Sequence, residues 1–189
     1  MSAIDPGLRE ELLHMAEVDQ DARRRLDRHP RLDQGVPEQE LTAAERADLD
    51  HLRAVDTSNT ARMRTIIGQH GWPGRSLVGD DGAQAAWLLV QHADHDPAFQ
   101  RACLELLGHA VKAGQADSGH HAYLTDRVLL AEGKQQLYGT QFMLVGGTWQ
   151  PRPLADPDRV DDRRRQVGLE PLADYLRRFE QLSPQGGDE

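Results

Sequence analysis

The feature of this 189-residue sequence that most limits its fold is a series of helix start and stop signals. Asp5 before Pro6 provides a side-chain cap followed by proline at the first helical position. The run Thr42-Ala-Ala-Glu45 has the spacing of a capping box, in which two residues at a helix N-terminus bond each other's backbone. Glycine and proline separate the segments that follow. This punctuation predicts a chain of helices joined by loops.

Between these signals, apolar residues recur at the spacing of one helix face. The pattern predicts helices over about 6–28, 42–70, 83–94, 97–113 and 118–131, a short helix near 159–166 and a last helix from about 170. Pro73 excludes its predecessor from the helical region, so we expect a loop over 71–82. The segment 83–94 is apolar on nearly every side, which predicts a central position for that helix.

After Gly133 the pattern changes from helical to strand-like. Residues 137–144 are rich in strand formers, Gly146-Gly147 has the composition of a two-residue hairpin turn, and Thr148 begins the return strand. We therefore predict a mainly α protein, a single-domain helical bundle with one C-terminal β-hairpin near 137–154. The expected organisation is an N-terminal helix and loop over 1–40, a helical domain over 41–182 and a disordered tail over 183–189.

Composition excludes several classes of partner. The net charge of −9 argues against nucleic acid, because binding to phosphates needs a basic surface. No apolar run approaches the ~20 residues of a membrane span, and no signal pattern opens the chain. Cys103, the only cysteine, lies in an apolar helical run and is expected to be buried and unreactive. We expect a cytoplasmic protein with a small-molecule or peptide substrate, no nucleic acid and no membrane; a homodimer stays open.

Polar residues interrupt the apolar segments between 83 and 141. A polar group in an apolar surrounding costs roughly 1–3 kcal/mol unless it is hydrogen-bonded. Such a cluster is therefore either a buried structural network or a functional site. Its members are Gln91, His92, Asp94, Asp126, Arg127 and Gln141.

His92 is the strongest single candidate, since imidazole is the side chain best suited to proton transfer near neutral pH. As a catalytic acid/base it would be oriented by Asp94 or Asp126. The alternative is a structural histidine whose charged form complements the helix C-terminus. Arg127 is either half of an ion pair between helices or a clamp for a carboxylate or phosphate, because its planar fork pairs with anions at two points.

A second set of residues is expected to bind the substrate. Gly139 permits close approach of the backbone, so its neighbours Tyr138, Thr140 and Gln141 could bond a polar ligand. Arg164 could reach the same pocket from the run of arginines at 163–165, or lie on the surface with the other two. Two further candidates either lie on a solvated helix face or point inward as positioning groups: Asp56 and Asn59.

Metal and nucleophile chemistry have weaker support. His92, His95 and Asp96 lie close in sequence, but Pro97 ends the helical pattern before a ligand set closes. The sequence has no His-Glu-x-x-His motif, no cysteine cluster and no Gly-x-Ser-x-Gly elbow. We therefore predict no metal site and no organic cofactor.

Several motifs occur together in a characteristic order. They are Gly71-Trp72-Pro73, Gly79, Trp87-Leu-Leu-Val-Gln-His-Ala-Asp94, Tyr123-Leu-Thr-Asp-Arg127, Gln136-Leu-Tyr-Gly-Thr-Gln141, Arg164 and Val167-Gly-Leu169. In this combination the chain resembles the bacterial domain-of-unknown-function family 6624 over about 56–169. The resemblance leaves the N-terminal helix and the tail outside. It implies domain limits and a bacterial origin but no activity, and it supports Gln91, His92, Asp126, Arg127, Tyr138 and Gln141 as site candidates.

Two functional hypotheses follow from these residues. The first is a metal-independent hydrolase or lyase of a biosynthetic pathway, in which His92 is the general acid/base and Arg127 holds an anionic group of the substrate. The second is a non-catalytic ligand-binding or pathway accessory module, in which the same polar cluster forms a receptor or a satisfied network.

Overall fold

The computed structural model describes residues 4–29, 31–32, 36–145 and 148–182. Over these residues the chain is mainly helical with one antiparallel hairpin, which confirms the predicted fold class. The elements are α1 (Pro6–Leu26), η2 (Glu38–Glu40), α2 (Ala43–His70), α3 (Arg75–Gln91), α4 (Pro97–Lys112), α5 (Ser118–Ala131), β1 (Phe142–Val145), β2 (Thr148–Pro151), η3 (Pro157–Arg159), α6 (Val160–Gln166) and α7 (Leu172–Leu182).

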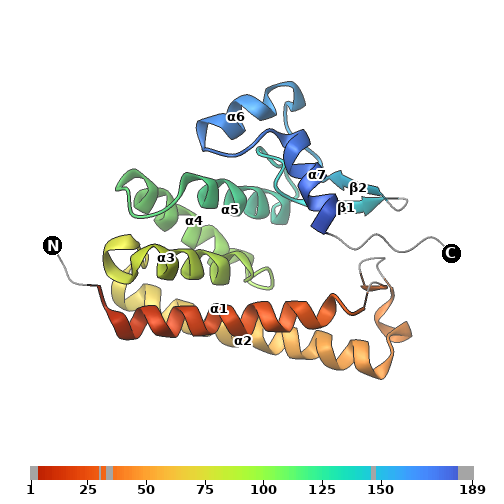
Figure 1. Ribbon diagram of the computed structural model, residues 1–189, viewed down its shortest axis with the longest axis horizontal. Coiled ribbons are helices and arrows are strands. Elements are labelled where there is room, and N and C mark those ends of the chain that lie inside the picture. The colour runs from red at the N-terminus through yellow and green to blue at the C-terminus, as the bar shows by residue number, and fades with distance from the viewer. Residues whose placement is uncertain (1–3, 30, 33–35, 146–147, 183–189) are drawn as a thin grey trace.

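The helices pack in successive layers (Figure 1). The long α1 and α2 lie side by side, α3 packs on both, and α4 and α5 pack together on the other side of α3. α6, α7 and the hairpin lie beyond α5 at the far side of the molecule. α1 and α2 extend past the end of α3, so the residues that follow α3 lie alongside this helical pair.

The two helix starts predicted from capping residues, at Asp5 and at Thr42, are confirmed. The Asp5 side chain accepts a hydrogen bond from the Leu8 amide at 3.0 Å. Both bonds of the capping box are present, with Glu45 N–H donating to Thr42 at 3.2 Å and Thr42 N–H donating to Glu45 at 2.8 Å. These side chains satisfy amide groups that a helix N-terminus leaves unpaired.

The predicted loop over 71–82 is wrong from Arg75 onward, because α3 begins there. Gln115, just after α4, accepts the Arg75 amide with its carbonyl at 3.0 Å and the Ser76 amide with its side chain at 2.8 Å. Gly79, at φ 75°, kinks the helix without ending it. α3 stops at Gln91, so His92 and the following residues lie in the connection to α4.

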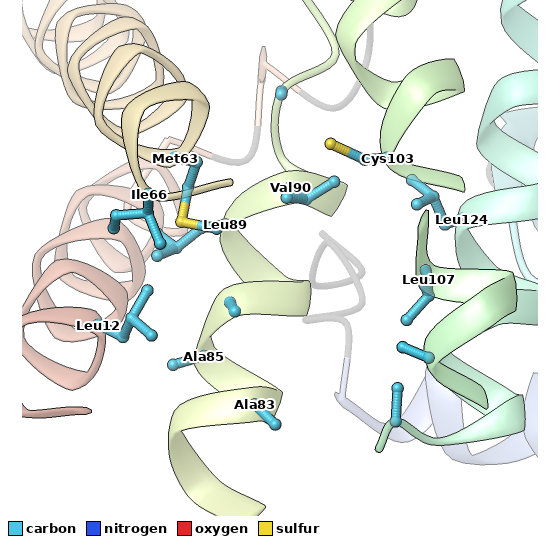
Figure 2. Close-up of a cluster of buried hydrophobic side chains, with 14 of the residues drawn as sticks. Leu12, Met63, Ile66, Ala83, Ala85, Leu89, Val90, Cys103, Leu107 and Leu124 are labelled. Carbon is cyan, nitrogen blue, oxygen red and sulfur yellow. The ribbon is translucent and has the colours of Figure 1, made fainter. Parts of the chain in front are cut away.

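One buried cluster joins α3 to the four helices around it, α1, α2, α4 and α5 (Figure 2). Leu12 of α1 and Met63 of α2 lie on one side of α3, and Leu107 of α4 and Leu124 of α5 lie on the other. α1 therefore shares its core with the rest of the helical domain. Cys103 is buried in this cluster as predicted, and burial raises the pKa of its thiol to about 12.

The hairpin is shorter than its sequence predicts. β1 and β2 pair from Phe142 with Pro151 to Val145 with Thr148. The strand expected over 137–141 is wrong, because this segment is a loop. The expected turn at 146–147 and the expected disordered tail at 183–189 lie outside the described residues. In the part of the chain that the structure describes, no helix is long and apolar enough to cross a membrane.

Candidate functional site

His92 lies directly after α3, and its ring reaches α1. Its Nδ1 is 2.8 Å from Oδ2 of Asp19, and the two side chains are 11% and 1% exposed, respectively. The prediction that Asp94 or Asp126 orients His92 is therefore wrong. The sequence separates Asp19 from His92 by most of three helices, so only the packing of α1 on α3 brings them together.

Arg23, one turn after Asp19 on α1, extends this pair to α2. Its Nη2 donates to Asp56 Oδ1 at 2.8 Å, and its Nε lies 3.3 Å from Asp19 Oδ2. Gln20 Nε2 also donates to Asp19, at 2.9 Å. We name Asp19, Arg23, Asp56 and His92 the charged cluster. In this cluster the Asp56 side chain points inward toward Arg23. Of the two alternatives expected for Asp56, this is the inward-pointing one and not the solvated helix face.

Two groups compete for Nδ1 of His92, since Arg23 Nε is 3.0 Å away and Asp19 Oδ2 is 2.8 Å away. Arg23 Nε–H needs Nδ1 as an acceptor, whereas the Asp19 carboxylate needs it as a donor. A single nitrogen either donates or accepts. An unprotonated Nδ1 would point its lone pair at the Asp19 carboxylate and be repelled by it. In the neutral ring Nδ1–H therefore donates to Asp19, and the lone pair lies on Nε2. None of the described residues hydrogen-bonds Nε2.

The two carboxylates of the charged cluster are perturbed in opposite directions. Burial acts to raise the pKa of Asp19, but the hydrogen bond and charge of His92 and the charge of Arg23 outweigh it and lower that pKa. Burial also raises the pKa of Asp56, and there the charge of Arg23 does not compensate. Asp19 is thus fixed as an anion beside the imidazole. Asn59, one turn after Asp56, is buried, and its Nδ2 has no partner among the described residues.

A pocket of about 350 Å³ lies beside the connection between α3 and α4, away from the charged cluster. Its lining residues are Asp94, Gln100, Arg127, Leu130, Ala131, Gln141 and Arg152. Arg127 Nη1 donates to Asp94 Oδ2 at 2.6 Å, while Arg127 Nε is buried without a partner among the described residues. The structure thus brings two predicted substrate-binding residues, Arg127 and Gln141, to one pocket.

The pocket and His92 are close neighbours in the chain. The Cα atoms of His92 and Asp94 are at most about 7 Å apart, because consecutive Cα atoms are separated by about 3.8 Å. Gln91, another predicted binding residue, is buried, and its Oε1 has no partner in the described part of the chain. His92 itself does not line the pocket.

Asp126 lies in a third polar group, which holds the loop before the hairpin. Its fully buried carboxylate accepts the amides of Leu137 at 2.7 Å, Tyr138 at 3.0 Å and Thr140 at 3.0 Å, together with the Thr140 hydroxyl at 2.9 Å. These bonds explain why 137–141 is a loop, since its amide groups are not available for a β ladder. Asp126 and Thr140 thus hold backbone and do not contact His92.

Arg164 and Gln136 complete this group. Arg164 is 1% exposed, and it donates to the carbonyls of Tyr138 at 2.6 Å and Glu170 at 2.5 Å. Burial lowers the pKa of its guanidinium. Gln136 donates to the Gln141 carbonyl at 3.0 Å and accepts the Gln141 amide at 3.0 Å. Arg164 is the buried member of its arginine run, but it binds the loop backbone and does not line the pocket.

Tyr138 is half-buried beside this loop, and its backbone is held at both the amide and the carbonyl. Burial and the charge of Asp126 raise the pKa of its phenol. Among the described residues, no three His, Cys, Asp or Glu side chains converge as metal ligands. Asp96, considered above with His92 and His95, instead caps α4 and pairs with Arg64.

Four residues of the charged cluster and of the pocket were not predicted from the sequence: Asp19, Arg23, Gln100 and Arg152. One signal for Asp19 was present. It lies at helical spacing from Leu8, Leu12 and Ala22, so a charged residue occupies the stripe that faces the core. Gln100 is likewise a buried polar residue beside Phe99 on α4.

Comparison with protein-family models matches residues 6–184 to a family of unknown function. The matched range includes α1, which the resemblance between motifs had left outside, and so it includes Asp19 and Arg23. No curated protein and no solved structure matches the chain. Because the family model spans nearly all of the helices and the hairpin, the chain belongs to the family of unknown function DUF6624.

Proposed function

We propose that this protein is a cytoplasmic hydrolase or lyase in which His92 acts as general acid/base on a small molecule or modified peptide with an anionic group. One observation carries the proposal. The Nδ1 atom of His92 is 2.8 Å from the buried Asp19 carboxylate, while Nε2 has no hydrogen bond among the described residues. An imidazole held in this way has one nitrogen fixed and the other available for proton transfer.

Asp19 has two effects on this chemistry. It fixes the tautomer in which Nε2 carries the lone pair, and its negative charge stabilises the imidazolium that forms when Nε2 takes a proton. Arg23 and Gln20 keep Asp19 ionised and in place. Nε2 would then remove a proton from a water molecule in hydrolysis, or from carbon in an elimination, and return it to the leaving group.

The anionic group of the substrate would bind in the neighbouring pocket. Arg127 and Arg152 supply positive charge there, and Gln141 supplies an amide. This arrangement would hold the substrate beside the 92–96 connection, at the end of α3 from which His92 extends.

The test measures turnover in a mixture of small molecules, so that no particular substrate has to be assumed. Wild-type protein, His92→Gln and His95→Gln are each incubated with the small-molecule fraction of a bacterial extract, and mass spectrometry records every ion over time. His95 is an exposed histidine three residues further on, so its variant is the matched control. We expect the spectra to reveal a small molecule that wild type and His95→Gln consume. His92→Gln should consume it at least about 100-fold more slowly. Equal consumption by His92→Gln, or no consumption by wild type, contradicts the proposal.

A second candidate is a ligand receptor without turnover. It is favoured by one observation, that the residues lining the 350 Å³ pocket do not include His92. Ultrafiltration of the same incubation mixtures tests this candidate. A receptor would retain a small molecule without consuming it, and His92→Gln would retain it equally well.

A further inference from the structure

We infer that the pocket beside Arg127 is a receptor for a carboxylate group, and that the Asp94 side chain fills this receptor when no ligand is bound. The inference rests on the proposed function in one respect only, in that it makes the carboxylate part of the substrate. The binding itself needs no turnover.

The Asp94 carboxylate is held at both oxygens by different residues. Arg127 Nη1 donates to Oδ2 at 2.6 Å, and Gln100 Nε2 donates to Oδ1 at 3.0 Å. Two donors that grip the two oxygens of one planar group have the spacing that any carboxylate requires. The position of Asp94 therefore shows how a ligand carboxylate would fit.

The donors are fixed and the acceptor is exposed. Gln100 is 1% exposed, and its Nε2 also donates to the Gln91 carbonyl at 2.9 Å, which sets the direction of its amide. The Asp94 side chain, in contrast, is 60% exposed and lies in the connection between α3 and α4. An exposed ion pair contributes little to stability. A ligand carboxylate can therefore replace Asp94 at small cost, while the receptor keeps its shape.

The pocket also holds binding capacity that Asp94 does not use. Arg127 Nε is buried and has no partner among the described residues. Arg152 lines the pocket, and its guanidinium forms no ion pair in the described part of the chain. The charged lining residues are thus two arginines and one aspartate, which leaves an excess of positive charge for an anionic ligand.

The donor set favours a carboxylate over a phosphate. Phosphate sites usually offer clustered backbone amides or a helix N-terminus, whereas the polar groups of this pocket are side chains, namely two guanidinium groups and two amides besides the Asp94 carboxylate. The volume of about 350 Å³ is near the lower end of ligand pockets, which span about 300–1,000 Å³. A small organic acid and the C-terminus of a peptide share this chemistry.

The experiment measures binding by NMR, through the Arg127 Nε–H and Gln100 side-chain signals of ¹⁵N-labelled protein. The probes are acetate, acetylated dialanine with a free C-terminus, the same peptide as its C-terminal amide, and inorganic phosphate. Asp94→Ala removes the internal carboxylate. Asp80→Ala, which removes an equally charged but 89% exposed side chain on α3, is the matched control. Asp94→Asn, with thermal melting of both variants, checks that the fold is retained.

We expect the free acids to shift both signals and to bind Asp94→Ala about tenfold or more tightly than wild type or Asp80→Ala, because no internal group competes. Arg127→Gln should abolish the shifts. Tighter binding of the peptide acid than of acetate identifies a peptide C-terminus, and equal binding identifies a small acid. The inference is overturned if the amide binds as well as the acid, if phosphate binds more tightly than either acid, or if no acid binds a folded Asp94→Ala or Asp94→Asn variant.

These results separate the inference from the proposed function. His92→Gln should bind the acids as wild type does, since His92 does not line the pocket. Carboxylate binding without any His92-dependent turnover would contradict the proposed function alone. Turnover that depends on His92 but acts on a substrate without a carboxylate would contradict the inference alone.

Discussion

The Asp126 group beside the hairpin is fully buried, whereas in the charged cluster at the end of α3 only Asp19 is, and the two groups satisfy their side chains differently. Asp126, Gln136 and Arg164 bond mainly to backbone amides and carbonyls of one loop and its neighbours. In the charged cluster the bonds run between side chains of three segments, from Asp19 to His92 and from Arg23 to Asp56.

We propose that this difference separates a structural role from a functional one. Side chains that replace missing backbone bonds hold a loop that has no regular structure of its own. Side chains that mainly bond one another leave the backbone independent of them. Within the charged cluster, His92 Nε2 makes no hydrogen bond to the described residues. One turn after Asp56, outside the cluster, Asn59 Nδ2 is buried and also has no partner among them. We therefore assign the Asp126 group to the fold and propose the charged cluster as part of the candidate site.

The largest expected effect comes from Asp126→Ala. The change leaves the buried amide and hydroxyl of Thr140 and the partly buried amides of Leu137 and Tyr138 without their acceptor, and each unsatisfied buried group costs about 1–3 kcal/mol. We expect the free energy of unfolding in urea to fall by about 4 kcal/mol or more. Asp162→Ala, at an exposed position of α6, is the control and should change it by less than about 0.5 kcal/mol. A loss below about 1 kcal/mol for Asp126→Ala would remove the structural role.

Gly139→Ala should have a smaller effect on the same loop. Gly139 has φ 66°, a conformation that costs other residues about 1–2 kcal/mol, and an added Cβ would lie 2.9 Å from the Leu172 side chain of α7. We expect a loss of about 2 kcal/mol in the free energy of unfolding. Gly133→Ala shares the positive φ but meets no atom within 4 Å, so the difference between the variants measures the packing against α7.

His92→Gln should change stability least among the substitutions of buried groups. A glutamine amide can still donate to Asp19, and Arg23 and Gln20 remain beside that carboxylate. We expect the free energy of unfolding to change by less than about 1 kcal/mol. The charged cluster would be a structural element like the Asp126 group if this variant lost about 3 kcal/mol.

The pH dependence of stability should distinguish the two carboxylates of the charged cluster. The folded-state pKa of Asp56 is raised, so its contribution to the free energy of unfolding falls as the pH rises from the ordinary value of 3.8 through the raised value. The pKa of Asp19 is lowered, so its contribution is present above 3.8 and is lost as the pH falls through the lowered value.

Asp56→Asn should therefore gain stability relative to wild type as the pH rises above 3.8, by about 1.4 kcal/mol for each unit of pKa shift. Urea unfolding at a series of pH values measures this difference. Parallel curves for wild type and Asp56→Asn above pH 3.8 would contradict the assignment of the raised pKa to Asp56.

The sequence predicts the helices well, because their caps are local. Asp5, Thr42 and Glu45 each act within one turn of the chain. The loop over 137–141 could not be predicted in this way. Its residues favour a strand, but Asp126, on the preceding helix, takes the amides that a strand would need.

The candidate site was predictable only in part. His92 stands out from its apolar neighbours, and Arg127 and Gln141 do reach one pocket. The partner of His92 could not be identified, because Asp19 is brought to it by the packing of α1 on α3 and not by any spacing along the chain. Asp94 and Asp126 were closer in sequence, but their carboxylates bind Arg127 and the loop backbone.

The protonation of the His92 ring decides whether this histidine can transfer a proton. A long-range ¹H–¹⁵N correlation spectrum of the neutral imidazole identifies which nitrogen carries the proton. We predict the proton on Nδ1, in a hydrogen bond to Asp19 that Asp19→Asn weakens, with Nε2 unprotonated. A proton on Nε2, with Nδ1 accepting from Arg23, would leave His92 without a free basic nitrogen and would contradict its role in proton transfer.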